Sequence, residues 1–261
     1  HRDLHSFPTR RSSDLMTVSA DGVRIEGIKF MNGNATDGGA VFVDASNVWF
    51  EKCEFANNTA SNWGGAIRTT SGSTGLNISR CKFYGNIATG EGKGGAIYLD
   101  DNPLDAITNT AIVSNCLFYD NQAYGSRAIY SMIGTDNGLK IYFCTFYSRI
   151  DPTTYLITST GADVRNSIFF NFFNDSNYFS GENCIESSRT SGQQIPTFID
   201  IDLDEEDFHL RHNSPICIDD CQKIEIGTVE INASMYDIEG YKRPRDDKDG
   251  TESDYNMGAY E

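Results

Sequence analysis

Acidic and basic side chains that could act in catalysis are scattered along this chain of 261 residues. General acid–base catalysis needs such groups within hydrogen-bond reach of one substrate. Outside the first 15 residues the only histidines are His209 and His212. Among the acids in the repeats the candidates are Asp44, Glu51, Asp100, Asp101 and Asp105, and among the bases they are Arg68, Arg80 and Lys93. Because these residues share no common spacing, we expect solvated turns and predict no catalytic residue.

Two acidic runs near the C-terminus have carboxylates spaced as in calcium sites. They are Asp200-Ile201-Asp202-Leu203-Asp204, and Asp247-Lys248-Asp249-Gly250 followed by Asp254. The second resembles an EF-hand loop, but its first position is Arg245 and its twelfth is Asn256, which breaks the ligand rule. Charged turns are therefore the favoured interpretation and calcium binding is the alternative. The sequence predicts no metal residue and no cofactor.

Aromatic side chains form a pattern that suits binding. One column, expected to point outward, consists of Tyr84, Tyr119 and Tyr147, with Ala56 and Phe170 at equivalent positions; a second consists of Phe42, Arg68, Tyr98 and Tyr130. Stacked aromatic rings can bind sugars by apolar contact, while tyrosine hydroxyls and arginine add polar contacts. These seven Tyr, Phe and Arg residues are the predicted binding site. The alternative is that the columns only stabilise the scaffold or lie beneath loops.

A sixfold repeat positions these columns. Its copies are Val23-Ile25-Ile28-Phe30, Val48-Phe50-Cys53-Phe55, Leu76-Ile78-Cys81-Phe83, Ala111-Val113-Cys116-Phe118, Leu139-Ile141-Cys144-Phe146 and Ala162-Val164-Ser167-Phe169. Their third positions are 25, 28, 35, 28 and 23 residues apart, which is typical of a solenoid. Alternation with period two predicts strands with one buried face. Two spacer residues interrupt the alternation where one strand bends into the next, which predicts a parallel β-helix.

Glycine and asparagine mark the turns of each coil. Asparagine follows the phenylalanine in Phe55-Ala56-Asn57-Asn58, Phe83-Tyr84-Gly85-Asn86 and Phe118-Tyr119-Asp120-Asn121, where stacked amides can bond along the axis. The glycine pairs 38–39, 64–65 and 94–95 precede a third strand, and Ser126-Arg127 replaces the fourth pair. In this strand we place Val41, Ile67, Ile97 and Ile129 inside. Three strands a coil predict a triangular cross-section.

Four of the seven cysteines occupy one repeat position. Cys53, Cys81, Cys116 and Cys144 should stack about 4.8 Å apart with parallel side chains, whereas a disulfide needs converging Cβ atoms. We therefore predict four buried free thiols. Cys184, Cys217 and Cys221 lie outside the repeat, and a bridge between the last two stays open.

Charge and composition divide the chain into three parts. Residues 1–15 resemble a translated sequencing adapter, so we treat them as a non-native leader; a basic N-terminal arm is the alternative. Residues 16–199 form the predicted β-helix of six to seven coils, and residues 200–261 an acidic cap over its end. The net charge of −16 disfavours nucleic acid and anionic lipid as partners. No apolar run is long enough for membrane insertion, and no oligomeric state is indicated.

The turn motifs resemble those of known proteins. Gly-Gly-Ala-Ile/Val and Phe-x-x-Asn are similar to the turns of polymorphic outer-membrane protein repeats and of the pectate-lyase-like superfamily, over residues 16–200. This resemblance implies an all-β, single-stranded right-handed parallel β-helix. The tail, with Phe208-His209-Leu210, Ser214-Pro215, Asp237-Ile238-Glu239-Gly240 and Asn256–Glu261, resembles the ending of secreted bacterial proteins called choice-of-anchor Q. Here Cys217, Asp220 and Asn256 depart from that pattern.

The resemblances imply a secreted or surface-attached bacterial protein and assign no reaction. Polygalacturonase-like enzymes carry a His-Gly and an Arg-x-Lys motif. The first is absent here, and the second occurs only as Arg80-Cys81-Lys82, far in the sequence from His209 and His212. We therefore expect a non-catalytic β-helix that binds a glycan or a cell-surface partner. The first alternative is a polysaccharide lyase or glycoside hydrolase, and the second is a phage tail or other structural fibre. An assay of polysaccharide turnover distinguishes the non-catalytic binding protein from the lyase or hydrolase.

Overall fold

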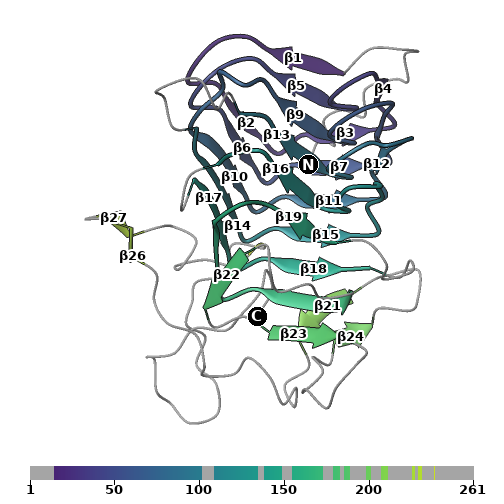
Figure 1. Cartoon of the computed structure of the whole chain (residues 1–261), viewed down its shortest axis with the longest axis vertical. Helices are drawn as coiled ribbons and strands as arrows, with labels where there is room; N and C mark the ends of the chain where they lie inside the picture. Colours follow the sequence, from purple (N-terminus) through teal and green to yellow (C-terminus); the bar gives the residue numbers. More distant parts are fainter. Residues whose placement is uncertain are drawn as a thin grey trace, which may run out of the picture.

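The computed structural model describes residues 15–101, 109–134, 138–148 and 155–172, with the short pieces 179–182, 185–188, 198–200, 207–210, 225–226 and 229–230 and residue 238. Side chains are described through Phe169 and at Ile238. Strands stack in register along the long axis of the molecule, with β1 at one end and β21 and β23 at the other (Figure 1). The predicted all-β parallel β-helix is confirmed.

Three long parallel sheets form the walls of the coils. Sheet I contains β1 (Met16–Val18), β5 (Val41–Val43), β9 (Ile67–Thr69), β13 (Ile97–Leu99), β16 (Ile129–Ser131) and β19 (Ile157–Thr158). Sheet II contains β2 (Arg24–Glu26), β6 (Trp49–Glu51), β10 (Leu76–Ser79), β14 (Ala111–Ser114), β17 (Leu139–Tyr142), β20 (Ala162–Arg165) and β22 (Phe179–Glu182). Sheet III contains β3 (Lys29–Met31), β7 (Glu54–Ala56), β11 (Lys82–Tyr84), β15 (Leu117–Tyr119), β18 (Thr145–Tyr147), β21 (Ile168–Phe172) and β23 (Ile185–Ser188).

A fourth, small sheet adds a strand that the sequence did not predict. It contains β4 (Asn34–Ala35), β8 (Thr59–Ala60) and β12 (Ile87–Ala88), so the first three coils have four strands each. The strands form because the backbone beyond the asparagine turn continues the ladder, as in the bond from the Ile87 amide to the Asn58 carbonyl. Beyond the coils, β24 (Phe198–Asp200) pairs with β25 (Asp207–Leu210), and β26 (Glu225–Ile226) with β27 (Val229–Glu230), both antiparallel.

The number of coils is slightly lower than predicted. From β1 to β19 the chain returns to sheet I five times, so the described residues make about five turns of this sheet instead of six to seven coils. The glycine turn that is lost after residue 147 does not end the sheet, because Ile157 still pairs with Ile129. These five turns connect six successive strands of sheet I, and we number the coils one to six by the strand at which each begins: β1, β5, β9, β13, β16 and β19.

The bend between sheets II and III has one backbone conformation in every coil. The second spacer residue has a positive φ of 49° to 68° at Gly27, Lys52, Arg80, Asn115, Phe143 and Asn166. A left-handed residue reverses the pleat locally, so the strand turns without losing its inward pattern. The predicted position of the bend is confirmed. Five of the six residues are not glycine, which is why composition alone did not reveal the conformation.

The phenylalanine at the end of each repeat forms a stacked column in the core. Rings of Phe30, Phe55, Phe83, Phe118, Phe146 and Phe169 lie 4.7–5.0 Å apart between centroids and within 10° of parallel. Each is at most 1% exposed. The inward set of sheet I is also buried, which confirms the predicted register of both strands.

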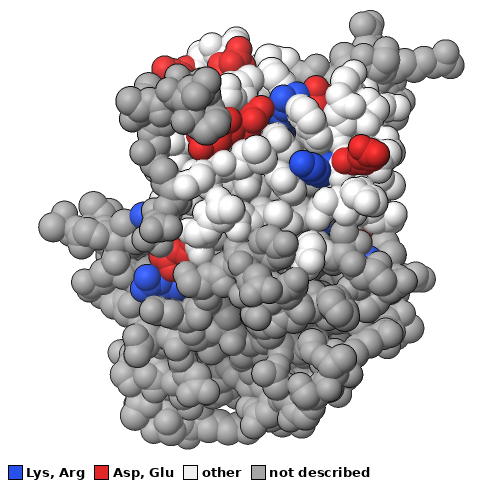
Figure 2. Space-filling model, in the orientation of Figure 1, with Lys and Arg blue, Asp and Glu red and all other residues white. Residues whose placement is uncertain are grey.

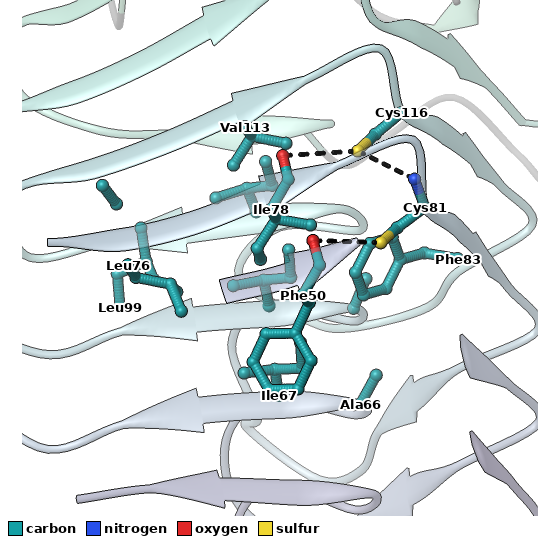
Figure 3. Packing of buried hydrophobic residues seen from close by; sticks show 14 of the residues in the cluster. Phe50, Ala66, Ile67, Leu76, Ile78, Cys81, Phe83, Leu99, Val113 and Cys116 are labelled. Carbon is teal, nitrogen blue, oxygen red and sulfur yellow. Dashed lines mark hydrogen bonds between the residues drawn. The ribbon is translucent and has the colours of Figure 1, made fainter. Parts of the chain in front are cut away.

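The four repeat cysteines are buried and free, as predicted. Figure 3 shows the thiols of Cys81 and Cys116 directed at the carbonyl oxygens of Phe50 and Ile78, at 3.6 and 3.7 Å. The Cys116 sulfur also accepts a bond from the Cys81 amide at 3.4 Å. All four are buried without a disulfide partner, so these groups act as small core residues. Cys184, Cys217 and Cys221 lie outside the described residues.

A buried asparagine ladder closes the turn after sheet III. The Asn58 amide nitrogen donates to Asn86 Oδ1 at 2.9 Å, and Asn86 donates to Asn121 Oδ1 at 2.9 Å. Each also donates to a carbonyl one coil below, as Asn86 does to Phe55 at 2.9 Å. The left-handed residue is the one before the ladder, such as Asn57 or Asp120. The predicted axial bonding is thus confirmed.

Candidate functional site: the outer faces of the coils

Several of the scattered acids and bases pair with one another across coils. Arg68 bonds to Asp37 at 2.6 Å and to Asp100 at 3.2 Å, while the carboxylate of Glu51 binds both Arg24 and Arg80. These contacts join neighbouring coils, so they fix the stack. Asp105, His212, Asp247 and Asp254 lie outside the described residues. In the part of the chain that is described, no three His, Cys, Asp or Glu side chains gather around a common metal position.

The second predicted column lies on the outer face of sheet I. The register aligns Phe42 with Arg68, Arg68 with Tyr98, and Tyr98 with Tyr130. The rings of Tyr98 and Tyr130 stack at 5.5 Å between centroids, 2° from parallel. The structure therefore brings these four residues together in the predicted order.

A neighbouring column, which the sequence reasoning missed, packs against this one. It consists of the residue before each turn glycine: Asp37, Trp63 and Lys93. Each precedes one strand of sheet I and contacts the outward residue of the strand after that: Asp37 pairs with Arg68, Trp63 stacks on Tyr98 at 5.2 Å, and the Lys93 ammonium lies 4.7 Å from the ring centre of Tyr130. The constant position before the glycine was the signal that could have revealed it.

Arg68 is the centre of this cluster. Its guanidinium carbon lies 4.7 Å from the ring centre of Trp63 and 5.8 Å from those of Phe42 and Tyr98. Two carboxylates and three rings therefore surround one cation, an arrangement that combines ion pairing with cation–π attraction. Figure 2 shows basic side chains beside acidic ones on the described surface, with uncharged side chains between them.

Tyr98 is more deeply buried than the sequence suggested. It is only 5% exposed, because Trp63 covers one ring face and Tyr130 the other. Burial raises its pKa to about 12, with the Asp100 carboxylate adding to the shift. A neutral, buried phenol cannot offer a ring face to a ligand. Phe42, Arg68 and Tyr130 remain partly exposed.

The first predicted column, on sheet III, is likewise filled by its own neighbours. Tyr84 and Tyr119 stack at 4.9 Å and 7°, and the Tyr84 hydroxyl donates to Glu54, which also pairs with Lys29 at 2.6 Å. Burial and then Glu54 raise the pKa of Tyr84. Tyr147 is only 4% exposed, and the Phe170 side chain lies outside the described part.

Outward rings on a solenoid therefore present edges and hydroxyls, not faces. Because coils repeat at the spacing of paired strands, rings in equivalent positions stack on one another. Sequence reasoning identified the columns but assigned the ring faces to a ligand. Two more exposed residues, Tyr124 (76% exposed) and Met132 (45%), flank the Tyr130 end of the sheet I cluster in sequence. Neither belongs to the two predicted columns, and the residues at the position of Met132 in earlier coils are the polar Asp44, Thr70 and Asp100, so periodicity gave no signal for an exposed apolar group.

Fold and surface together define a parallel β-solenoid whose outer columns carry aromatic and charged side chains. Residues 9–169 match the family described as right handed beta helix region. The chain belongs to this family, which also gives the hand of the coil expected from the turn motifs.

One curated relative has a similar sequence. The probable autotransporter YfaL of Escherichia coli K12 is 31% identical over 119 residues, which make up 44% of this chain and 9% of that protein. The chain thus spans far less than two thirds of this relative. No solved structure matches the chain. Among the described residues there is no helix with the length and apolar character of a membrane span.

Proposed function

We propose that this chain is a non-catalytic part of a secreted or cell-surface bacterial protein, and that it binds a glycan through the outer face of sheet I. The observation that carries the proposal is the cluster around Arg68, in which Trp63 and Lys93 join the predicted column that ends at Tyr130. Aromatic edges, hydroxyls and a fixed cation side by side are typical of surfaces that recognise polar ligands.

The charge of the cluster favours an uncharged ligand. Asp37 and Asp100 compensate Arg68, and Lys93 lies against the Tyr130 ring and donates to its hydroxyl at 3.2 Å. A chain with a net charge of −16 also repels polyanions over long distances. Neutral glycans that bond to the Tyr130 hydroxyl and to the edges of Phe42 and Trp63 therefore fit best.

The proposed location has two supports. The similar protein is named as a probable autotransporter, and the C-terminal motifs resemble the choice-of-anchor Q ending. Most of that ending lies outside the described residues, so its role stays a prediction. A cell-surface partner other than a glycan would use the same exposed edges.

A glycan array followed by titration tests the proposal. The double variant Lys93→Ala/Tyr130→Ala should weaken a neutral-glycan hit by about tenfold or more, because it removes an ammonium and a hydroxyl from one point of the cluster. The matched control, Tyr84→Ala/Tyr119→Ala, removes two rings from sheet III and should leave that hit unchanged. Equal losses in both variants would contradict the location on sheet I.

Turnover separates the proposal from its catalytic alternative. Incubation with neutral and acidic polysaccharides should give no new reducing ends and no unsaturated products. Cleavage of any member would instead favour a polysaccharide lyase or glycoside hydrolase. Calcium should be added in a parallel reaction, because the two acidic C-terminal runs are untested as ligands.

A further inference from the structure

Trp49 has an indole ring without a stacking partner among the described residues, on a face that no predicted column uses. It lies in β6 on the outside of sheet II, 39% exposed. Among the described residues it makes none of the ring, cation–π or hydrogen-bond contacts that hold Trp63 between Arg68 and Tyr98. Single exposed hydrophobic residues are common, so the surroundings of Trp49 decide whether it forms a site.

The ridge around Trp49 runs across neighbouring strands. The register places Arg24 beside Trp49, then Asn77, Ile112 and Lys140 in successive coils. β2, β6, β10, β14 and β17 lie side by side along this wall (Figure 1). Asn77 and Ile112 are partly exposed. The surface beside the indole is therefore a polar amide followed by an aliphatic side chain.

The polar groups next to the indole differ in whether their hydrogen-bonding atoms already have partners. Both carboxylate oxygens of Glu51 are bound, one by Arg24 and the other by Arg80, so the Arg24 guanidinium is neutralised and held at one end of the ridge. The Asn77 side-chain amide has no hydrogen bond within the described chain. It can therefore both donate and accept, as a sugar hydroxyl does.

We propose that Trp49 and Asn77 form a second saccharide-binding site, on sheet II, for an uncharged pyranose chain. The apolar face of one sugar ring stacks on the free indole face, and its hydroxyls bond to the Asn77 amide. The neighbouring sugar lies over Ile112. This site is independent of the cluster on sheet I, where stacked neighbours already occupy the ring faces.

The two tryptophans of the chain make the site directly observable. In a Trp63→Phe background, Trp49 is the sole tryptophan, and its fluorescence reports contact with a ligand. Cello-, manno-, xylo- and chito-oligosaccharides are titrated one by one. We expect at least one of them to change the emission saturably, and added salt to leave its affinity unchanged. A panel in which no member changes the Trp49 emission would overturn the proposal.

Matched variants distinguish this site from the one on sheet I. By calorimetry with that oligosaccharide, Trp49→Ala should abolish binding, and Asn77→Ala should weaken it by about five- to tenfold. Lys140→Gln, three strands from the indole, should leave it within about twofold. If Trp49→Ala binds normally while Lys93→Ala/Tyr130→Ala does not, the second site is wrong and the function proposed for sheet I stands. If Trp49→Ala changes only self-association by sedimentation, the ridge is a protein interface and the proposal is also overturned.

Discussion

The early and late coils follow the same strand pattern, yet they bury their outward side chains to different extents. On sheet III the outward position before the core phenylalanine is occupied by Lys29, Glu54 and Lys82, then by Leu117, Thr145 and Ile168. The three charged residues are partly exposed, whereas each of the last three is 1% exposed. Alternation therefore gives the direction of a side chain, and the residue type at that position indicates whether water reaches it.

The outward residues of sheet III change from partly exposed to buried between Lys82 of coil three and Leu117 of coil four. The glycine turns before sheet I change at the same boundary. In the early coils the first turn glycine has a positive φ, as at Gly64 and Gly94, and the second leaves no room for a Cβ atom: one at Gly65 would lie 2.0 Å from the Gly95 oxygen. In coil four, Arg127 occupies the second position, is 5% exposed and donates to Ser148 at 2.7 Å. Regular turns thus accompany exposed walls, and irregular turns accompany covered ones.

The largest expected effect tests what the two regions share. Phe55→Ala and Phe118→Ala should each lower the free energy of unfolding by about 3–5 kcal/mol, because each ring lies between two others and leaves a cavity. Tyr119→Ala, which removes an outward ring of the same strand, should cost much less. Denaturant unfolding measures all three. Equal costs for Phe118 and Tyr119 would contradict the register.

A charge swap across the boundary sharpens the comparison. Lys82 and Leu117 are register partners on adjacent strands, so Leu117→Lys introduces into the late coils the residue type of the early ones. It should cost at least about 2 kcal/mol, because an ammonium would be buried without a partner. Lys82→Leu should change stability by less than about 0.5 kcal/mol. Comparable losses in both variants would mean that the two walls are equally covered.

The asparagine ladder tests the turns of the early coils alone. Asn86→Ala should cost about 1–3 kcal/mol, because it leaves the Phe55 carbonyl and the Asn58 amide without their buried partners. Asn57→Gly is the control: Asn57 is exposed with a φ of 54°, and glycine adopts that conformation without strain. Chemical denaturation measures the free energy of unfolding of both variants. We expect it to be lower for Asn86→Ala, and unchanged or higher for Asn57→Gly.

The smallest expected effect concerns alkaline pH. The pKa of Tyr98 is raised to about 12 in the folded chain, whereas an unfolded tyrosine ionises near about 10. Between these values the unfolded chain has lost a proton that the folded chain retains, so stability should fall as the pH rises through this window. Below it the contribution is fully present. Tyr98→Phe should flatten the slope; an unchanged slope would contradict the burial of this phenol between Trp63 and Tyr130.

The candidate sites were predictable only as far as the repeat extends. Phe42, Arg68, Tyr98 and Tyr130 share a repeat position, so their alignment followed from the sequence. Trp63 was missed because it precedes β9 in the chain but packs on Tyr98 of the following strand, β13. Trp49 shares its outward position with Arg24, Asn77, Ile112 and Lys140, a column of mixed residue types in which no chemical pattern stands out.

The sequence by itself determined the coil: period-two alternation, a repeated interruption and a fixed phenylalanine require strands that bend and return in register, since any slip would turn the core side chains outward. It also determined the thiol and amide ladders, because equivalent positions stack. Only the tertiary structure decided which outward side chains are exposed and which ring faces are free. These properties depend on neighbours one coil away or on another wall, at distances along the chain that local pattern does not encode. Tyr98 and Trp49 differ for this reason alone: Tyr98 has a ring on either side, whereas Trp49 has none among the described residues.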